Sequence, residues 1–210
     1  MPKIRGTHAS RIIHTQVISS FLTVSKEALY LISSPTPYLL FYSLFRYMQT
    51  DPNWANFLYN PKTGKLGLLD FGATREWNKS FVDTYFKIIQ GGANGDRKQV
   101  LDNSVKLGFL TGYENNEMNE AHVTSVIILS EAFRENKPYN FATQNATLRM
   151  QELVPIMLKN RLCPPPPEIY SLHRKMSGMF LMASKLKAEI DCSKIYRKVE
   201  AEYIELSVNS

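Results

Sequence analysis

Cysteine is scarce in this sequence of 210 residues: Cys163 and Cys192 are its two copies, and neither belongs to a C-x-x-C pair. This scarcity excludes a disulfide-rich secreted domain and a cysteine-based zinc module, so we expect two unpaired thiols. A large excess of one charge is also lacking, because 25 Lys and Arg stand against 19 Asp and Glu, a net charge of +6. So small and dispersed a surplus does not favour nucleic acid as a partner. The apolar share of 44% excludes a disordered chain and is sufficient for a globular core.

Acidic residues are absent from the first 25 positions, which are basic and rich in Ser and Thr. This composition is typical of a mitochondrial targeting segment, and an ordinary basic terminus is the simpler alternative. Charged residues are also missing between Ala28 and Phe45, but Pro35 and Pro37 interrupt that stretch. A membrane-spanning helix needs about 20 apolar residues without such a break, so we expect a buried segment instead. A helix in the core is expected over Tyr38–Met48.

The rest of the sequence predicts one short β-hairpin followed by helices. Asn56–Tyr59 and Lys65–Leu69 are the expected strands, and Asn60–Gly64 is the turn between them. Apolar residues at helical spacing dominate the remainder, so a mainly α fold is expected. The first predicted helix begins at Asn78 or Ser80 and ends at Gly91-Gly92, and the second runs from Gly95 or Asp96 to Gly108 with Val100, Leu101 and Val105 facing inward. The third lies around Met118–Ala132, and the fourth, over Thr147–Leu158, is bent or shortened by Pro155. The fifth runs from Pro167 to about Lys187, and the sixth from Ser193 to about Leu206.

Two polar side chains lie at one end of the predicted hairpin. Asp70 ends the second strand, which is apolar, so its backbone is expected to be buried and its carboxylate to need a partner or a metal. If Tyr59 faces Lys65 across the turn, Asn56 lies beside Leu68, close to Asp70. Oxygen ligands of this kind are the ones that Mg²⁺ requires. The hairpin therefore predicts a magnesium site made by Asn56 and Asp70.

Asp51 lies five residues before Asn56, on the loop that leads into the hairpin. A carboxylate there could accept a proton or orient a hydroxyl group or a water molecule. D-x-x-x-x-N followed by D-F-G is the catalytic-loop and metal-binding pattern of protein-kinase-like enzymes. The alternative without chemistry is that Asp51 caps a turn, Asn56 sits in a loop and Asp70 forms an ion pair. The combined spacing favours the kinase-like interpretation.

Further motifs narrow the family. The catalytic loop reads Q-T-D, and D-F-G continues as Ala73-Thr-Arg-Glu76. Together with Phe109–Tyr113, the run Pro164–Pro167 and Ser171–Lys175, the sequence closely resembles the UbiB (aarF-domain) atypical kinases, and most of all their mitochondrial coenzyme Q-biosynthesis branch. The resemblance implies a protein-kinase-like C-terminal lobe over residues 45–206 with the small N-terminal lobe absent. Residues 1–44 are then an atypical N-terminal segment, either a targeting sequence or an unrelated exon.

The resemblance also implies a function. Asp51 takes the role of the catalytic aspartate, and Asn56 and Asp70 hold Mg²⁺ on ATP. The family is associated with ubiquinone biosynthesis at the matrix face of the mitochondrial inner membrane. Its expected partners are coenzyme Q-biosynthesis enzymes and a lipid surface. Basic residues of the fifth predicted helix and its end, which are Arg174, Lys175, Lys185 and Lys187, are expected on a solvated face, with contact to anionic lipid headgroups as the alternative.

Several parts of the family pattern are missing. Gly6 is the single glycine before Asp51, so no glycine-rich loop precedes it, and the alanine-rich loop and K-x-G-Q motif of the family are absent. Because phosphoryl transfer depends on positioning and electrostatics, we expect this chain alone to bind nucleotide weakly and to turn over little. About eight residues separate Gly72 from Ser80 and no A-P-E follows, which disfavours protein substrates. The alternative function is a non-catalytic helical scaffold that binds lipid or partner proteins.

Overall fold

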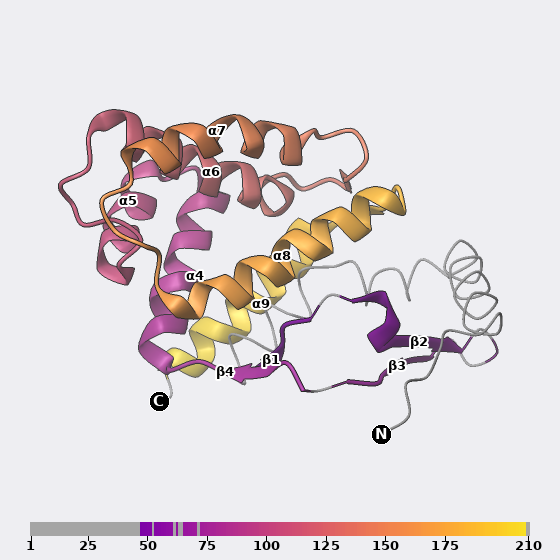
Figure 1. Ribbon diagram of the computed structural model, residues 1–210. Coiled ribbons are helices and arrows are strands. Elements are labelled where there is room, and N and C mark those ends of the chain that lie inside the picture. Colours follow the sequence, from indigo (N-terminus) through magenta and orange to yellow (C-terminus); the bar gives the residue numbers. More distant parts are fainter. Residues whose placement is uncertain (1–46, 52, 61, 63–64, 71, 209–210) are drawn as a thin grey trace, which may run out of the picture.

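The computed structural model describes residues 47–51, 53–60, 62, 65–70 and 72–208 (Figure 1). Helices dominate this part of the chain, so the expected mainly α fold is confirmed. The α-helices of the described residues are α4 (Lys79–Asn94), α5 (Arg97–Leu107), α6 (Asn116–Arg134), α7 (Ala146–Asn160), α8 (Pro167–Lys185) and α9 (Cys192–Val208). None of them is both long and apolar enough to cross a membrane. The charge-free stretch 28–45, the expected targeting segment and the boundary at residues 44–45 lie outside the described residues.

Three two-stranded antiparallel sheets accompany the helices in the described residues, where one hairpin was expected. The hairpin pairs β2 (Phe57–Asn60) with β3 (Lys65–Leu68). The other two sheets join β1 (Tyr47–Gln49) to β4 (Thr74–Glu76), and β5 (Tyr139–Asn140) to β6 (Glu189–Ile190). Local sequence patterns do not predict such pairs, because the partners lie far apart in the sequence. The end of the helix expected over Tyr38–Met48 is therefore wrong, since Tyr47 and Met48 belong to a strand.

The register of the hairpin differs by one residue from the expected one. Tyr59 pairs with Leu66, and Asn60 pairs with Lys65. The reversal starts one residue later because Asn60 closes an Asx turn, in which its Oδ1 accepts the backbone N–H of Lys62 at 3.0 Å. Asn60 is thus the last residue of β2 and not the first of the turn.

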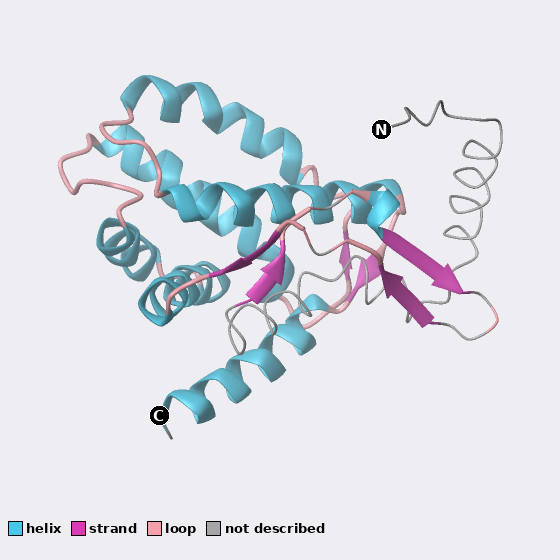
Figure 2. Cartoon of the chain, turned by 60° about the horizontal axis from the view of Figure 1, so that its bottom comes forward, coloured by secondary structure: helices cyan, strands magenta, loops and turns pink. Residues whose placement is uncertain are grey.

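Sheet β1–β4 holds together the two ends of the segment 50–73, which contains the hairpin and is here termed the excursion. The backbone N–H of Thr50 and its Oγ1 both donate to the carbonyl oxygen of Ala73, at 3.1 and 2.8 Å. Residues 50 and 73 are thereby held together, and the chain between them leaves the helical body and returns to it (Figures 1 and 2). Trp77, which follows β4, is buried and donates from Nε1 to the carbonyl oxygen of Glu168 in α8 at 3.2 Å. The excursion is therefore anchored to the start of α8.

The first helix of the body begins as expected and ends later. Asn78 is the N-cap of α4, and its Oδ1 accepts the backbone N–H of Phe81 at 2.8 Å. The expected end at Gly91-Gly92 is wrong, because α4 continues to Asn94 and is capped by Gly95 in the left-handed conformation, with φ of 74°. Gly92 serves close packing instead, since a Cβ there would lie 2.3 Å from Oγ of Ser130 in α6.

The core lies between these helices, and its largest contributions come from α4, α6, α8 and α9. α7 forms an outer layer without fully buried residues and continues past Pro155 to Asn160, so the proline does not shorten the helix, and the alternative of a bend stays a prediction. α5 runs between Asp96 and Gly108 as expected. Its Val105 is exposed, however, and Ser104 takes the inward position because its hydroxyl group hydrogen-bonds the buried His122. The two cysteines are both free, as expected.

Candidate functional site

Asp51 and Asn56 are in direct contact at the base of the hairpin. Nδ2 of Asn56 donates to Oδ2 of Asp51 at 2.7 Å, while the backbone N–H of Asn53 donates to Oδ1 at 3.2 Å. Oδ1 of Asn53 in turn accepts the backbone N–H of Ala55 at 3.1 Å. These local turns lead into the 3-10 helix η2 (Trp54–Asn56), and Asn56 is 8% exposed. The sequence D-x-N therefore folds the loop so that Asp51 faces Asn56.

This hydrogen bond orients the amide group of Asn56. The amide nitrogen faces Asp51, so Oδ1 on the opposite side of the amide is the atom that could bind a cation. The carboxylate of Asp51 accepts from two N–H groups of its own loop, which fixes its plane. One residue is thus suited to hold a metal ion, and the other to orient or deprotonate a nucleophile.

Asp70 follows Leu69, whose backbone is hydrogen-bonded to Asn56. The backbone N–H of Leu69 donates to the carbonyl oxygen of Asn56 at 2.9 Å, which extends the hairpin ladder to the residue before Asp70. Oδ1 of Asp70 accepts the backbone N–H of Gly72 at 2.7 Å. A Cβ at position 72 would lie 3.1 Å from that oxygen, so glycine suits this close approach.

Asp70 is exposed, and the expectation that its backbone is buried is wrong. The apolar residues of β3 suggested burial, but the hairpin projects from the helical body in both views (Figures 1 and 2). Leu69, the residue before Asp70, is itself 56% exposed. The carboxylate therefore faces solvent, so a cation could bind to it from the surface of the molecule.

The structure joins Asp51 to Asn56 and places Asp70 one residue from the main-chain partner of Asn56. Among the described residues no group of three or more His, Cys, Asp or Glu could hold a metal ion. One carboxylate and one amide oxygen nevertheless fit Mg²⁺, which takes one or two carboxylates and completes its shell with phosphate oxygens and water. The donor set of Asn56 and Asp70 is thus chemically consistent with the predicted site.

Lys175 was expected on a solvated or lipid-facing surface, and the structure corrects this. Its side chain in α8 is 1% exposed. Burial lowers the pKa of its ammonium to about 8, and the negative charge of Asp51 acts in the opposite direction. The signal was present in the sequence, because Lys175 follows Leu172 by three residues and precedes Met179 by four, on the apolar face of the helix.

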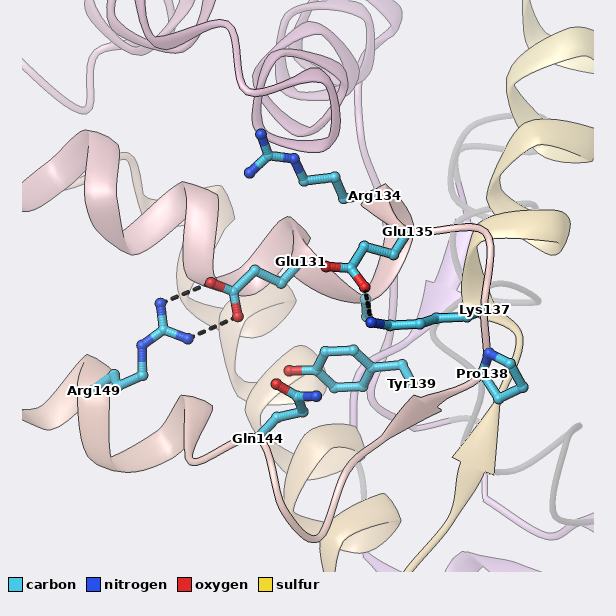
Figure 3. Close-up of a pocket in the computed structure, with 9 residues that line it drawn as sticks. Glu131, Arg134, Glu135, Lys137, Pro138, Tyr139, Gln144 and Arg149 are labelled. Carbon is cyan, nitrogen blue, oxygen red and sulfur yellow. Dashed lines mark hydrogen bonds and ion pairs between the residues drawn. The ribbon is translucent and has the colours of Figure 1, made fainter.

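A separate cavity of about 370 Å³ lies between the end of α6 and the start of α7 (Figure 3). Arg149 forms a bidentate ion pair with Glu131, at 2.8 and 2.7 Å, and Lys137 pairs with Glu135. Burial raises the pKa of Tyr139, which borders the cavity, to about 12. None of the three predicted site residues lines this cavity, and its acidic groups are neutralised by its own basic ones.

Comparison with known proteins finds kinase-like relatives. Residues 30–104 match the ABC1 atypical kinase-like domain, a stretch that includes Asp51, Asn56 and Asp70. The chain is 52% identical over 165 residues to atypical kinase coq-8, mitochondrial, of Caenorhabditis elegans, and this match covers 77% of the chain and 22% of that protein. It is 50% identical over 159 residues to atypical kinase COQ8B, mitochondrial, of Danio rerio, and this match covers 76% of the chain and 26% of that protein. Its identity to atypical kinase COQ8, mitochondrial, of Saccharomyces cerevisiae is 47% over 159 residues, and this match covers 75% of the chain and 32% of that protein.

The chain therefore spans between a fifth and a third of the length of these relatives. Their names agree with the prediction of a mitochondrial protein. The domain match begins at residue 30, within the segment 1–44 that the sequence analysis set apart, so the boundary after residue 44 stays a prediction. Over the part that it spans, the chain belongs to the UbiB/COQ8 family of atypical kinases.

Proposed function

We propose that this chain holds Mg²⁺-bound ATP through Asn56 and Asp70, with Asp51 as the catalytic-loop aspartate. The observation that carries the proposal is the hydrogen bond of 2.7 Å from Asn56 Nδ2 to Asp51 Oδ2. It turns the amide oxygen of Asn56 away from the carboxylate and toward the side where a cation could bind. The alternative role of Asp51, a simple turn cap, accounts for its contact with Asn53 but not for this second contact.

The residues divide the chemistry between them. Asn56 and Asp70 would hold the cation, which neutralises phosphate charge when it is bound. Asp51 orients the attacking hydroxyl group or water molecule and accepts its proton. Its carboxylate stays in place because two N–H groups of the loop hold it. This arrangement supplies positioning, the main requirement of phosphoryl transfer.

The acceptor that we propose is water or a small or lipid molecule. The backbone between Gly72 and the start of α4 at Lys79 is short and is occupied by β4, which pairs with β1. A peptide-docking platform of the protein-kinase type needs a longer segment at this position. The family resemblance supports a role in ubiquinone biosynthesis at the matrix side of the inner membrane, with coenzyme Q-biosynthesis enzymes and a lipid surface as partners. We further propose that residues 1–210 by themselves turn over little.

The second candidate function is a non-catalytic scaffold that binds lipid or partner proteins. It is favoured by α7, whose Leu148, Val154 and Leu158 are exposed on the outer layer of the helical body. Exposed apolar residues on one helix are suited to contact another protein or a lipid surface. This candidate does not require Asp51, Asn56 or Asp70.

Calorimetric titration with Mg²⁺ and ATP separates the two functions. We expect the wild-type chain to bind Mg²⁺-ATP weakly, and Asp70→Asn to weaken that binding about tenfold or more, because a metal ligand loses its charge. Asp102→Asn is the matched control, since Asp102 lies exposed on α5 and pairs with Lys98. Equal affinity of the wild type and Asp70→Asn would reject the metal role. Absence of binding in the wild type would favour the scaffold.

A further inference from the structure

The cavity between the end of α6 and the start of α7 contains a buried hydroxyl group that the fold leaves without a partner. Tyr139 of β5 lines the cavity and is 7% exposed, and its Oη has no hydrogen-bond partner among the described residues. Buried tyrosine hydroxyl groups usually have such a partner, because an unmade hydrogen bond costs free energy. The fold therefore offers a hydrogen bond that a molecule inside the cavity can complete.

The ring that carries this hydroxyl group is held in place. Tyr139 pairs with Ile190 in sheet β5–β6, and the ring centroids of Tyr139 and Phe141 lie 4.8 Å apart at an angle of 73°. Phe141 in turn contacts Phe180 of α8, with centroids 5.4 Å apart. Because burial raises the pKa of Tyr139 to about 12, the hydroxyl group keeps its proton at neutral pH. The cavity thus contains a fixed group that can donate a hydrogen bond.

The charges nearest to this hydroxyl group cancel. Arg149 donates to both carboxylate oxygens of Glu131, at 2.8 and 2.7 Å. Figure 3 shows the Tyr139 hydroxyl group directed to the side of the cavity where this ion pair lies. Lys137 and Glu135 form a second ion pair in the lining. The surroundings of the hydroxyl group are therefore polar but carry no net charge.

Arg134 lines the cavity as well but belongs to neither ion pair. Its guanidinium group extends away from Tyr139 (Figure 3). It lies beside the C-cap of α4, where a Cβ at Gly95 would be 3.0 Å from Nη2 of Arg134. A cation at the C-terminus of a helix interacts favourably with the helix dipole. The charge of Arg134 thus serves α4 and does not act next to the hydroxyl group.

Such surroundings favour an uncharged ligand. An anion would meet the Glu131 carboxylate and a cation would meet the Arg149 guanidinium, and neither would find an unpaired charge of opposite sign beside Tyr139. A hydroxyl group both accepts and donates hydrogen bonds, and a carboxylate oxygen that accepts one N–H can accept a further donor. Two neighbouring hydroxyl groups can therefore accept from Tyr139 and donate to Glu131.

We propose that this cavity binds a small uncharged polyol through two neighbouring hydroxyl groups, one accepting from Tyr139 and the other donating to Glu131. Its volume of about 370 Å³ falls in the range of small-molecule sites, roughly 300 to 1,000 Å³. Asp51, Asn56 and Asp70 do not line the cavity, so the proposal is independent of Mg²⁺-ATP binding. The competing explanation is that water alone fills the cavity and bonds the hydroxyl group.

NMR titration of the full chain with two isomers of cyclohexanediol tests the proposal. The hydroxyl groups are on neighbouring carbons in the vicinal isomer and at opposite ends of the ring in the other, so size and polarity are matched. A local signal is needed because polyols stabilise folded proteins without binding to them. We expect the vicinal isomer to shift the side-chain amide signal of Gln144, which lines the cavity, at lower concentration than its isomer.

Three results of this titration would overturn the proposal. Equal binding of the two isomers would show that neighbouring hydroxyl groups are not recognised. A shift with neither isomer would assign the cavity to water. A larger shift with acetate or methylammonium than with the vicinal diol would show that the ligand is charged.

Tyr139→Phe removes the hydroxyl group and keeps the ring. We expect its affinity for the vicinal isomer to be about fivefold weaker than that of the wild type, which corresponds to one hydrogen bond. Tyr113→Phe, at a position that is 89% exposed, is the matched control and should keep the wild-type affinity. An unchanged affinity in Tyr139→Phe would reject the role of the hydroxyl group.

Thermal denaturation of Tyr139→Phe without diol provides an independent test. Since no group among the described residues bonds the hydroxyl group, its removal should leave Tm unchanged or raise it. A marked fall in Tm would mean that the hydroxyl group already has a partner within the fold, and the proposal would fail.

Discussion

The helical body and the excursion between residues 50 and 73 are stabilised by different forces. In the body, side chains such as Met118 are fully buried, and the removal of apolar surface from water is the main stabilising contribution. In the excursion, Leu58 and Leu69 are about half exposed, and the backbone is shaped by side chains that bond nearby N–H groups. The predicted catalytic and metal-binding residues all lie in the second region. The residues that stabilise the fold and those of the proposed chemistry are therefore largely separated in this chain.

The largest expected effect concerns the buried core of the body. Met118→Ala should lower the free energy of unfolding by about 2–5 kcal/mol, because it removes a fully buried side chain and leaves a cavity. Leu69→Ala in the excursion should change it by less than about 0.5 kcal/mol, because Leu69 is mostly exposed. Urea denaturation followed by circular dichroism measures both. Similar losses in the two variants would show that the excursion shares the stability of the core.

The pH dependence of stability is also expected to belong to the body. Burial lowers the pKa of His122 to about 4, and its Nε2 lies 2.8 Å from Oγ of Ser104. The unfolded chain therefore binds a proton near pH 6.5 that the folded chain binds only near pH 4. The contribution of His122 to stability is complete above pH 6.5 and is lost as the pH drops toward 4, by up to about 3 kcal/mol at about 1.4 kcal/mol per pKa unit.

His122→Gln isolates this contribution. Gln does not titrate, so the unfolding free energy of the variant should depend less on pH between 6.5 and 4, even if the variant is less stable at pH 7. Urea denaturation at several pH values provides the comparison. A slope equal to that of the wild type would assign the acid sensitivity to other groups.

Two glycines allow the same substitution in both regions. Gly92→Ala should lower the free energy of unfolding by about 1–3 kcal/mol, because the added Cβ would lie 2.3 Å from Oγ of Ser130 and must push α4 and α6 apart. Gly72→Ala should cost less than about 1 kcal/mol, since its nearest neighbour is the Asp70 carboxylate at 3.1 Å. The second variant should instead weaken Mg²⁺-ATP binding, because Asp70 has to move. Thermal denaturation and calorimetric titration test the two effects separately, and the reverse pattern would contradict the division between the regions.

What the sequence predicted follows from the range of the interactions involved. The caps Asn78, Asp96 and Gly108 and the hydrogen-bonding loop between Asp51 and Asn56 depend on residues close in the chain, so their local patterns were informative. Sheets β1–β4 and β5–β6 join distant segments, and no local pattern marks them. Gly91-Gly92 suggested a helix end, but Gly91 packs against Val100 of α5 and Gly92 against Ser130 of α6, and the sequence does not place these helices.

The same reasoning explains why the burial of Lys175 was missed. The metal-binding and catalytic candidates were found because D-x-x-x-x-N and D-F-G have a fixed spacing. Lys175 lies 124 positions after Asp51 in the numbering (175 − 51) and belongs to no such motif. Its place on an apolar helical face was visible, but the reason for a charge there depends on the tertiary structure.

The smallest expected loss of stability is that of Lys175→Met, a substitution in α8 of the helical body. Because burial lowers the pKa of Lys175 to about 8, the folded chain binds fewer protons than the unfolded chain between about pH 8 and 10.5, and that part of the stability rises with pH in this window. At pH 7 the full cost of burying the charge is present. Methionine removes this cost together with the attraction to Asp51, so we expect thermal denaturation to give an unchanged or higher Tm at pH 7 and a smaller advantage at pH 10. A clear loss of stability at pH 7 would mean that the lysine is needed by the fold, and the removal of apolar surface from water would not be the main stabilising contribution at α8.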